Sequence, residues 1–205
     1  MPPRRSPKKT STKSSTRAKG VIRGFKTKQD FADWLEKNHG NTEGILLRIA
    51  KKDSGLKSIT YQEALEIALC YGWIDAIKLP ENDKTWLQRF LPRRAKSIWS
   101  KINREKAIAL IESGLMRPPG HAEIERAKND GRWEAAYDSP AKAQAPPEFL
   151  AALDRNPKAK AFFETINRSN RYAITWRLAT AKTPEKRERL LRTFVDMLEK
   201  GKTLH

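Results

Sequence analysis

The sequence predicts an α+β fold in which a small mixed or antiparallel sheet with flanking helices is followed by a helical C-terminal part, so that helix predominates. Short apolar runs alternate with helically spaced apolar residues up to about residue 100, and beyond that point the apolar spacing is helical. With 205 residues, 38% hydrophobic residues and six tryptophans, the chain can form a sizeable core.

The N-terminal end of the chain carries much of the positive charge. Formal net charge is +18 for the whole chain, yet residues 1–29 hold ten Lys/Arg and no acid. Residues 1–24 have almost no apolar side chains and cannot offset their ordering entropy, so we expect a disordered basic tail there. Such a tail raises non-specific affinity for polyanions.

Residues 25–137 are expected to form an α+β domain. Thr27 stands three residues before Asp30 and marks the start of a helix, and Thr60 with Glu63 forms a capping box that starts a second one, which Gly72 ends. The apolar runs predict strands at residues 44–51, 73–77 and 86–90, and the spacing predicts further helices at residues 100–114 and 121–128.

The last third of the chain is predicted to be helical. Residues 138–147 are rich in Pro and Ala and are typical of a linker. Residues 148–205 form the C-terminal helical region, which we expect to pack on the first domain because neither part alone has much core. Its predicted helices cover residues 148–155, 158–166, 169–181 and about 184–200.

Several classes of protein are disfavoured. Cys70 is the only cysteine, which excludes an intramolecular disulfide; we expect a small buried apolar residue, with a reactive thiol as the alternative. The three histidines are far apart in the sequence, so neither a metal site nor a cofactor is predicted. No apolar stretch has the length of a membrane span, and the N-terminus lacks a secretory signal, so the expected location is cytoplasmic.

The segment from Trp86 to Arg104 predicts an anion-binding surface. It contains six Lys/Arg and no Asp or Glu, with aromatic side chains among them. Positive charge beside flat apolar groups suits a phosphate, a carboxylate or a stacked base. Adjacent arginines can also fork onto such anions. The candidate ligand-binding residues in this segment are Trp86, Arg89, Phe90, Arg93, Arg94, Ser97 and Trp99.

A structural interpretation of the same residues stays open, in which the aromatic side chains are core and the arginines form a solvated or ion-paired face. Asp75 is a further candidate, because a carboxylate at a strand end beside arginines could orient a guanidinium or act as a base. Such an aspartate can equally cap a turn or join an ion pair.

Several blocks of the chain, in the same order, resemble the YdeI/OmpD-associated family, whose members are also called bacteriocin-protection proteins. The blocks are Ala68-Leu-Cys-Tyr-Gly-Trp-Ile-Asp75, Gln88-Arg-Phe-Leu-Pro-Arg-Arg94, Ser97-Ile-Trp-Ser-Lys-Ile-Asn103, Gly131-Arg-Trp-Glu-Ala-Ala-Tyr-Asp138, Ala161-Phe-Phe163, Asn170-Arg-Tyr-Ala-Ile174 and Thr180-Ala-Lys-Thr-Pro184. The resemblance extends over about residues 25–205. Ala76 departs from it, since the family usually has Gly after the Asp.

The resemblance implies a mainly bacterial, cytoplasmic protein associated with envelope stress or bacteriocin resistance, and it transfers no catalytic residues. Established catalytic motifs are also missing from the sequence, so a non-catalytic protein that binds an anionic ligand is favoured. The ligand would be a small phosphorylated or carboxylated molecule. The alternatives are a nucleic-acid-binding protein helped by the basic tail, and an enzyme that uses Asp75 with Arg89 or Arg93.

Overall fold

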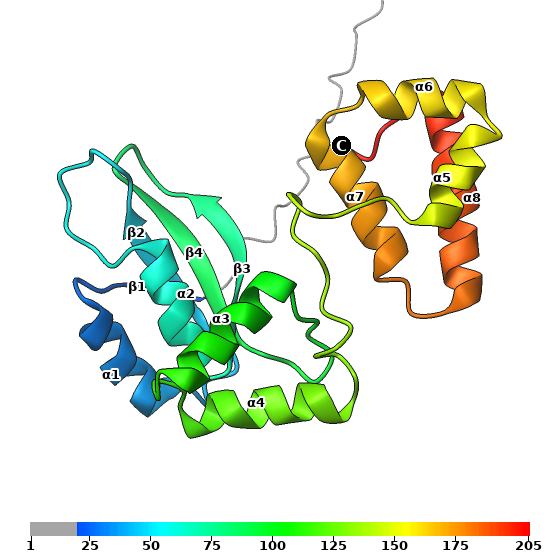
Figure 1. Cartoon of the computed structure of the whole chain (residues 1–205). Helices are drawn as coiled ribbons and strands as arrows, with labels where there is room; N and C mark the ends of the chain where they lie inside the picture. Colours follow the sequence, from blue (N-terminus) through cyan, green and yellow to red (C-terminus); the bar gives the residue numbers. More distant parts are fainter. Residues whose placement is uncertain (1–19) are drawn as a thin grey trace, which may run out of the picture.

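The computed structural model describes residues 20–205 and confirms the α+β class, with one small sheet and a predominance of helix (Figure 1). Two lobes lie side by side, and an extended segment joins them. The N-terminal lobe (residues 20–137) contains the sheet and four helices, and the C-terminal lobe (residues 147–205) contains four more. The predicted disorder of residues 1–19 lies outside the described residues.

The sheet is mixed. Its strands are β1 (Val21–Gly24), β2 (Ile45–Ala50), β3 (Trp73–Pro80) and β4 (Thr85–Pro92), in the spatial order β1-β2-β4-β3. β1 runs parallel to β2, whereas β4 is antiparallel to both of its neighbours. The β3–β4 register shifts between Asp75 and Lys78, which is typical of a bulge. Three of the strands correspond to the three predicted from apolar runs.

β1 corrects the boundary of the expected tail, because residues 21–24 are part of the sheet. All four residues of this strand are exposed, so it joins the sheet through its backbone ladder to β2 rather than by burying side chains. An edge strand without a buried face has no apolar periodicity to detect. The ordered part of the chain therefore begins before the predicted residue 25.

The first three helices of the N-terminal lobe begin at the predicted caps. The helices of this lobe are α1 (Lys28–Asn38), α2 (Tyr61–Cys70), α3 (Lys101–Glu112) and α4 (Pro118–Asn129). Capping boxes are present at Thr27 and Thr60, and the Ser100 side chain accepts from the Asn103 amide. α4 starts three residues earlier than predicted because Pro118 takes the first helical position, where its missing N–H is not needed.

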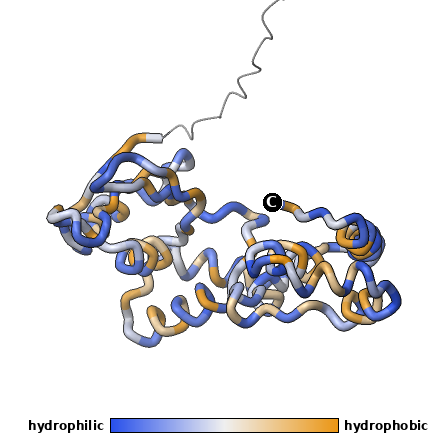
Figure 2. The backbone as a smooth tube through the Cα atoms, turned by 90° about the horizontal axis from the view of Figure 1, so that it is seen from above, coloured by the Kyte–Doolittle hydropathy of each residue, from blue (hydrophilic) through white to orange (hydrophobic). Residues whose placement is uncertain are grey.

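The C-terminal lobe is a group of short helices with its own core. The helices are α5 (Pro147–Asp154), α6 (Pro157–Thr165), α7 (Arg168–Ala179) and α8 (Pro184–Glu199), close to their predicted ranges. Asn156, Asn167 and Thr183 cap the last three of them. Figure 2 shows hydrophobic and hydrophilic residues alternating along the helices of both lobes, as expected for helices with one buried side.

The buried apolar residues form two separate clusters. One extends from Phe31 to Ala136 and the other from Phe149 to Leu198, so each lobe has its own core. Between the lobes, the Tyr137 and Trp176 rings pack edge to face with their centroids 6.0 Å apart. The described residues contain no helix long and apolar enough to cross a bilayer.

Candidate functional site

The predicted Trp/Arg segment does not form one surface. Phe90 is fully buried on β4, where its ring lies 6.0 Å from that of Phe31. Arg89 is half-buried and donates to the Glu43 carbonyl oxygen at 3.1 Å. Arg94 is exposed, and its backbone N–H donates to the Ser97 hydroxyl. The candidate residues therefore point into different environments.

Arg93 and Trp99 belong to the interior of the N-terminal lobe. Arg93 is only 5% exposed, and its Cζ atom lies 3.4 Å from the centroid of the Trp99 ring. Its Nη1 donates to the Ile98 carbonyl oxygen at 3.3 Å. Burial lowers the pKa of Arg93 to about 10, while the negative charge of Glu123 acts in the opposite direction.

Residues far from the predicted segment complete this interior cluster. Arg126, which forms an ion pair with Glu123 within α4, donates to the Arg93 carbonyl oxygen at 3.4 Å. Arg132 donates to the Ser97 carbonyl oxygen at 2.7 Å, so the two arginines hold the 93–99 segment against α4 and the turn after it. Five buried N–H groups of the cluster have no acceptor in the described part of the chain, and they belong to Arg93, Trp99, Arg126 and Arg132. Sequence reasoning missed Arg126 and Arg132 because their separation from Arg93 exceeds thirty residues.

Asp75 lines a cavity of about 340 Å³ between the lobes, which we call the Asp75 pocket. α2, β3, α3, the segment after α4 and α7 all contribute to its wall. The lining residues are Tyr61, Gln62, Leu65, Asp75, Ser100, Ile102, Asn103, Lys106, Tyr137, Ser139, Pro140 and Tyr172. Neither Arg89 nor Arg93 is among them.

Burial raises the pKa of all three tyrosines of the Asp75 pocket, and the Asp75 carboxylate adds to the effect on two of them. The Tyr61 hydroxyl donates to Asp75 Oδ2 at 2.8 Å. Burial, and secondly the charge of Asp75, raises the pKa of Tyr61 and also that of Tyr137. Burial raises the pKa of Tyr172 as well. These hydroxyls therefore stay protonated at neutral pH and can donate or accept hydrogen bonds.

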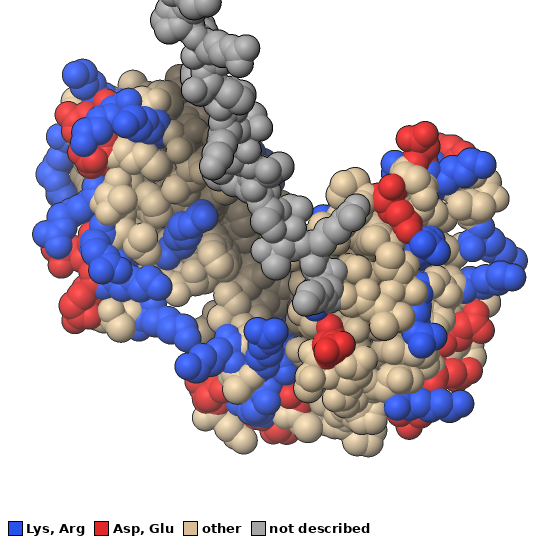
Figure 3. All heavy atoms as spheres, turned by 180° about the vertical axis from the view of Figure 1, so that it is seen from behind, with Lys and Arg blue, Asp and Glu red and all other residues tan. Residues whose placement is uncertain are grey.

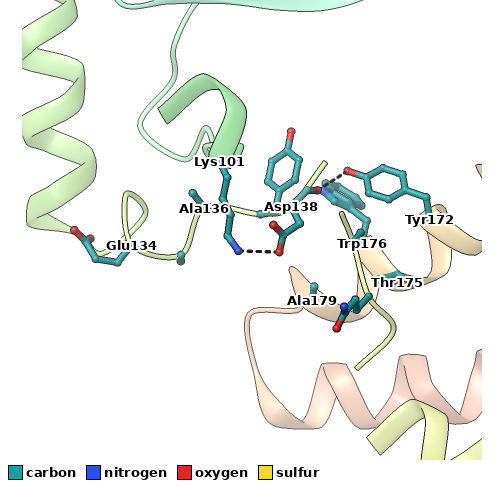
Figure 4. A pocket seen from close by; sticks show the side chains of 12 residues that line it. Lys101, Glu134, Ala136, Asp138, Tyr172, Thr175, Trp176 and Ala179 are labelled. Carbon is teal, nitrogen blue, oxygen red and sulfur yellow. Dashed lines mark hydrogen bonds and ion pairs between the residues drawn. The ribbon is translucent and has the colours of Figure 1, made fainter. Parts of the chain in front are cut away.

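A second cavity of about 340 Å³ shares Tyr137 and Tyr172 with the Asp75 pocket, and we call it the Asp138 pocket. Figure 4 shows Lys101 reaching Asp138, with Tyr172 and Trp176 entering from α7. The Lys101 ammonium lies 2.8 Å from the Asp138 carboxylate, and the Tyr172 hydroxyl donates to the Asp138 carbonyl oxygen at 3.3 Å. Two of the charged residues that line this cavity, Lys101 and Asp138, are thus paired with each other, and their ion pair connects α3 to the segment between the lobes.

Trp86 lies in a different place, at the end of the sheet where β3 and β4 meet the loop after β2. It lines an open groove of about 630 Å³ that we call the lysine groove. The lining residues are Ala50, Lys51, Lys52, Lys78, Leu79, Pro80 and Trp86. The Lys78 ammonium lies 4.4 Å from the centroid of the Trp86 ring. In the sequence, only their positive charge marks these lysines as candidate binding residues, and they share that charge with many other surface residues.

The lysines of the lysine groove are gathered around one aromatic ring and have no carboxylate partner in the described part of the chain. Among the described residues, no carboxylate forms an ion pair with Lys51, Lys52 or Lys78. Figure 3, the view from behind, shows Lys and Arg spread over both lobes with Asp and Glu among them, and a surface that is hollowed between the lobes. Within residues 20–205 no group of three or more His, Cys, Asp or Glu could hold a metal ion.

The fold and these sites define a two-lobed protein, with an α+β lobe followed by a helical one. Residues 142–201 match the family described as bacteriocin-protection, YdeI or OmpD-associated, so the C-terminal lobe is a domain of this family. Residues 23–123 match a domain of unknown function, DUF8412. The resemblance is thus confirmed for the C-terminal part, whereas the blocks at residues 68–103 lie in the other domain. No curated protein and no solved structure matches the chain.

Proposed function

We propose that this protein binds an anionic ligand, without catalysis, in the lysine groove. The observation that carries the proposal is the set of three lysines around Trp86 that have no carboxylate partner among the described residues. Ammonium groups neutralise a phosphate or carboxylate, and the Trp86 ring offers contact area to a flat group attached to it. This keeps Trp86 in the ligand-binding role predicted from the sequence and gives the neutralising role to lysines of β3 and the loop after β2.

A non-catalytic role fits the placement of the arginines. An enzyme that uses Asp75 with Arg89 or Arg93 would need these groups in one concave site. The Arg93 guanidinium is instead stacked on Trp99, and Arg89 donates to the Glu43 carbonyl oxygen. The cytoplasmic location and the association with envelope stress or bacteriocin resistance that the resemblance implies are part of the same proposal, and cell fractionation of the tagged protein tests the location.

The experiment compares AMP with adenosine, because the two share a flat base and differ in the phosphate. We expect AMP to bind the full chain in isothermal titration calorimetry and adenosine to bind about tenfold more weakly. Lys78→Ala and Trp86→Leu should each weaken AMP binding, whereas Lys128→Ala, an exposed lysine on α4, should not. Equal binding of AMP to Lys78→Ala and the parent protein would overturn the proposal.

Single-stranded nucleic acid is the second candidate ligand, and the arrangement of neighbouring lysines favours it. A second groove shares Ala50 with the lysine groove and adds Lys26 and Lys57 to the same end of the sheet. Spaced ammonium groups near an aromatic ring are typical of surfaces that follow a phosphate backbone. Binding of an oligothymidylate should fall steeply with salt and weaken when residues 1–19 are removed, whereas AMP binding should not depend on those residues.

A further inference from the structure

The Asp75 pocket carries one negative and one positive side chain, and neither is paired with the other. Apart from Asp75 and Lys106, every residue that lines the cavity is uncharged. Among the described residues the ion pair of Lys106 is with Glu66, and Asp75 has none. A cavity with two separate opposite charges and otherwise neutral walls is complementary to a ligand that itself carries both charges.

The carboxylate of Asp75 is available to such a ligand. Its Oδ2 atom accepts from the Tyr61 hydroxyl, and its Oδ1 atom has no hydrogen-bond donor within residues 20–205. The charge of Asp75 acts weakly on the pKa of Arg93, but the Arg93 guanidinium is buried against Trp99 and does not line the cavity. A free carboxylate in a cavity is a binding group for an ammonium.

The ammonium of Lys106 is also available. Its contact with Glu66 is 3.5 Å long, and the side chains of the two residues are 27% and 41% exposed, so water screens this pair and it contributes little. Ser100 and Asn103, in the cap and first turn of α3, line the cavity beside it. Helix N-termini carry partial positive charge, which adds to that of Lys106. This part of the cavity suits a carboxylate.

We propose that the Asp75 pocket binds a small zwitterion, with its ammonium at Asp75 and its carboxylate toward Lys106. The ligand class is that of free amino acids, and the rings of Tyr61, Tyr137 and Tyr172 supply contact area for the carbon skeleton and attraction for the ammonium. The cavity volume of about 340 Å³ is at the lower end of that of small-molecule sites, which fits a single amino acid. This proposal is independent of ligand binding in the lysine groove.

The test screens the full chain by thermal shift against the common L-amino acids and γ-aminobutyrate, each at about 10 mM. Each compound that raises the melting temperature is then titrated calorimetrically together with its N-acetyl derivative, which lacks the positive charge, and its carboxamide, which lacks the negative charge. We expect at least one amino acid to bind and both derivatives to bind about tenfold more weakly. Failure of all the amino acids to raise the melting temperature would overturn the proposal.

Variants test whether Asp75 binds the ammonium of the ligand and Lys106 its carboxylate. Asp75→Asn and Lys106→Met should each weaken binding of the amino acid about tenfold, and Asp75→Asn should abolish the difference between the amino acid and its N-acetyl derivative. Asp83→Asn and Lys128→Met make the same chemical changes at exposed positions outside the cavity and should leave the affinity unchanged. Circular dichroism verifies that each variant is folded.

Two results would contradict the assignment. The first is that folded Asp75→Asn binds the amino acid with unchanged affinity. The second is that an N-acetyl derivative binds as tightly as its parent amino acid. Either result would show that the ligand ammonium does not bind at Asp75. Lys78→Ala, which alters the lysine groove, should leave amino-acid binding intact, so failure of the proposed function and failure of this inference are distinguishable.

Discussion

The guanidinium of Arg93 lies flat enough on Trp99 that its Cζ atom is 3.4 Å from the ring centroid. Trp99 in turn packs edge to face on Trp133, with 4.8 Å between centroids. A chain of three side chains thus connects the end of β4 to the turn after α4. In the sequence, the combination of Arg and Trp predicts a ligand-binding surface. In the structure, Arg93 and Trp99 instead join two parts of one core.

This position of Arg93 leads to a prediction about stability. Arg93→Met should leave the free energy of unfolding unchanged or raise it by about 1 kcal/mol, because methionine still covers Trp99 and removes a buried charge with two unpaired N–H groups. Arg93→Ala should lower it by about 2 kcal/mol, because it leaves a cavity. Urea denaturation followed by circular dichroism measures both. If methionine were as costly as alanine, the charge of Arg93 rather than its volume would hold the segment.

Arg94→Met serves as the control for this comparison. Arg94 is the next residue in the chain and is exposed, so its substitution should change the free energy of unfolding by less than about 0.5 kcal/mol. A larger effect at Arg94 would show that positive charge in this segment matters for folding irrespective of burial.

The contrast between Arg93 and Arg94 also shows where sequence reasoning ends. The helices were predictable because caps such as Thr27 and Thr60 act within three residues of the helix start, and the three core strands were predictable from their apolar runs. Which of two adjacent arginines enters the core depends on Trp133 and Arg126, which come from other elements. Likewise, only the fold places Asp75 opposite α3 and α7.

Gly72 allows a test of how α2 and α4 fit together. It has φ of +71° and a Cβ atom at this position would lie 2.9 Å from the Pro119 carbonyl oxygen. Gly72→Ala should therefore lower the free energy of unfolding by more than about 2 kcal/mol, through backbone strain and a clash with α4. Gly131→Ala has similar strain at φ of +76° but open space around the Cβ atom, so it should cost only about 1 kcal/mol. Equal costs in urea denaturation would mean that α4 can move away from Gly72.

Cys70 should behave as an inert residue of the core. It is buried, and burial raises the pKa of its thiol to about 11, so roughly a thousandth of it is thiolate at pH 8. We expect very slow reaction with a disulfide reagent in the native protein and complete reaction within minutes in concentrated urea. Rapid labelling of the native protein would instead favour the alternative of a reactive thiol.

The tyrosines should make the protein sensitive to alkaline pH. Burial raises the pKa of all four, which are Tyr61, Tyr71, Tyr137 and Tyr172, and that of Tyr71 reaches about 12. A group whose pKa is higher in the folded than in the unfolded state contributes stability that is fully present below the unfolded value, near pH 10, and is lost as the pH rises through the folded value. Arg93 acts in the opposite direction, since its pKa is lowered to about 10 and its charge disappears earlier in the folded state.

Four tyrosines against one arginine give a net loss, so the free energy of unfolding should fall as the pH rises from about 10 toward 12. Absorbance near 295 nm should show phenolate forming at higher pH in the native protein than in urea, where it should form near pH 10. Tyr61→Phe should make the fall in stability shallower, because its hydrogen bond to Asp75 is among the causes of the raised pKa. Native tyrosines that titrate near pH 10 would show that the Asp75 pocket is open to water, and both its enclosed form and its fit to a small ligand would have to be revised.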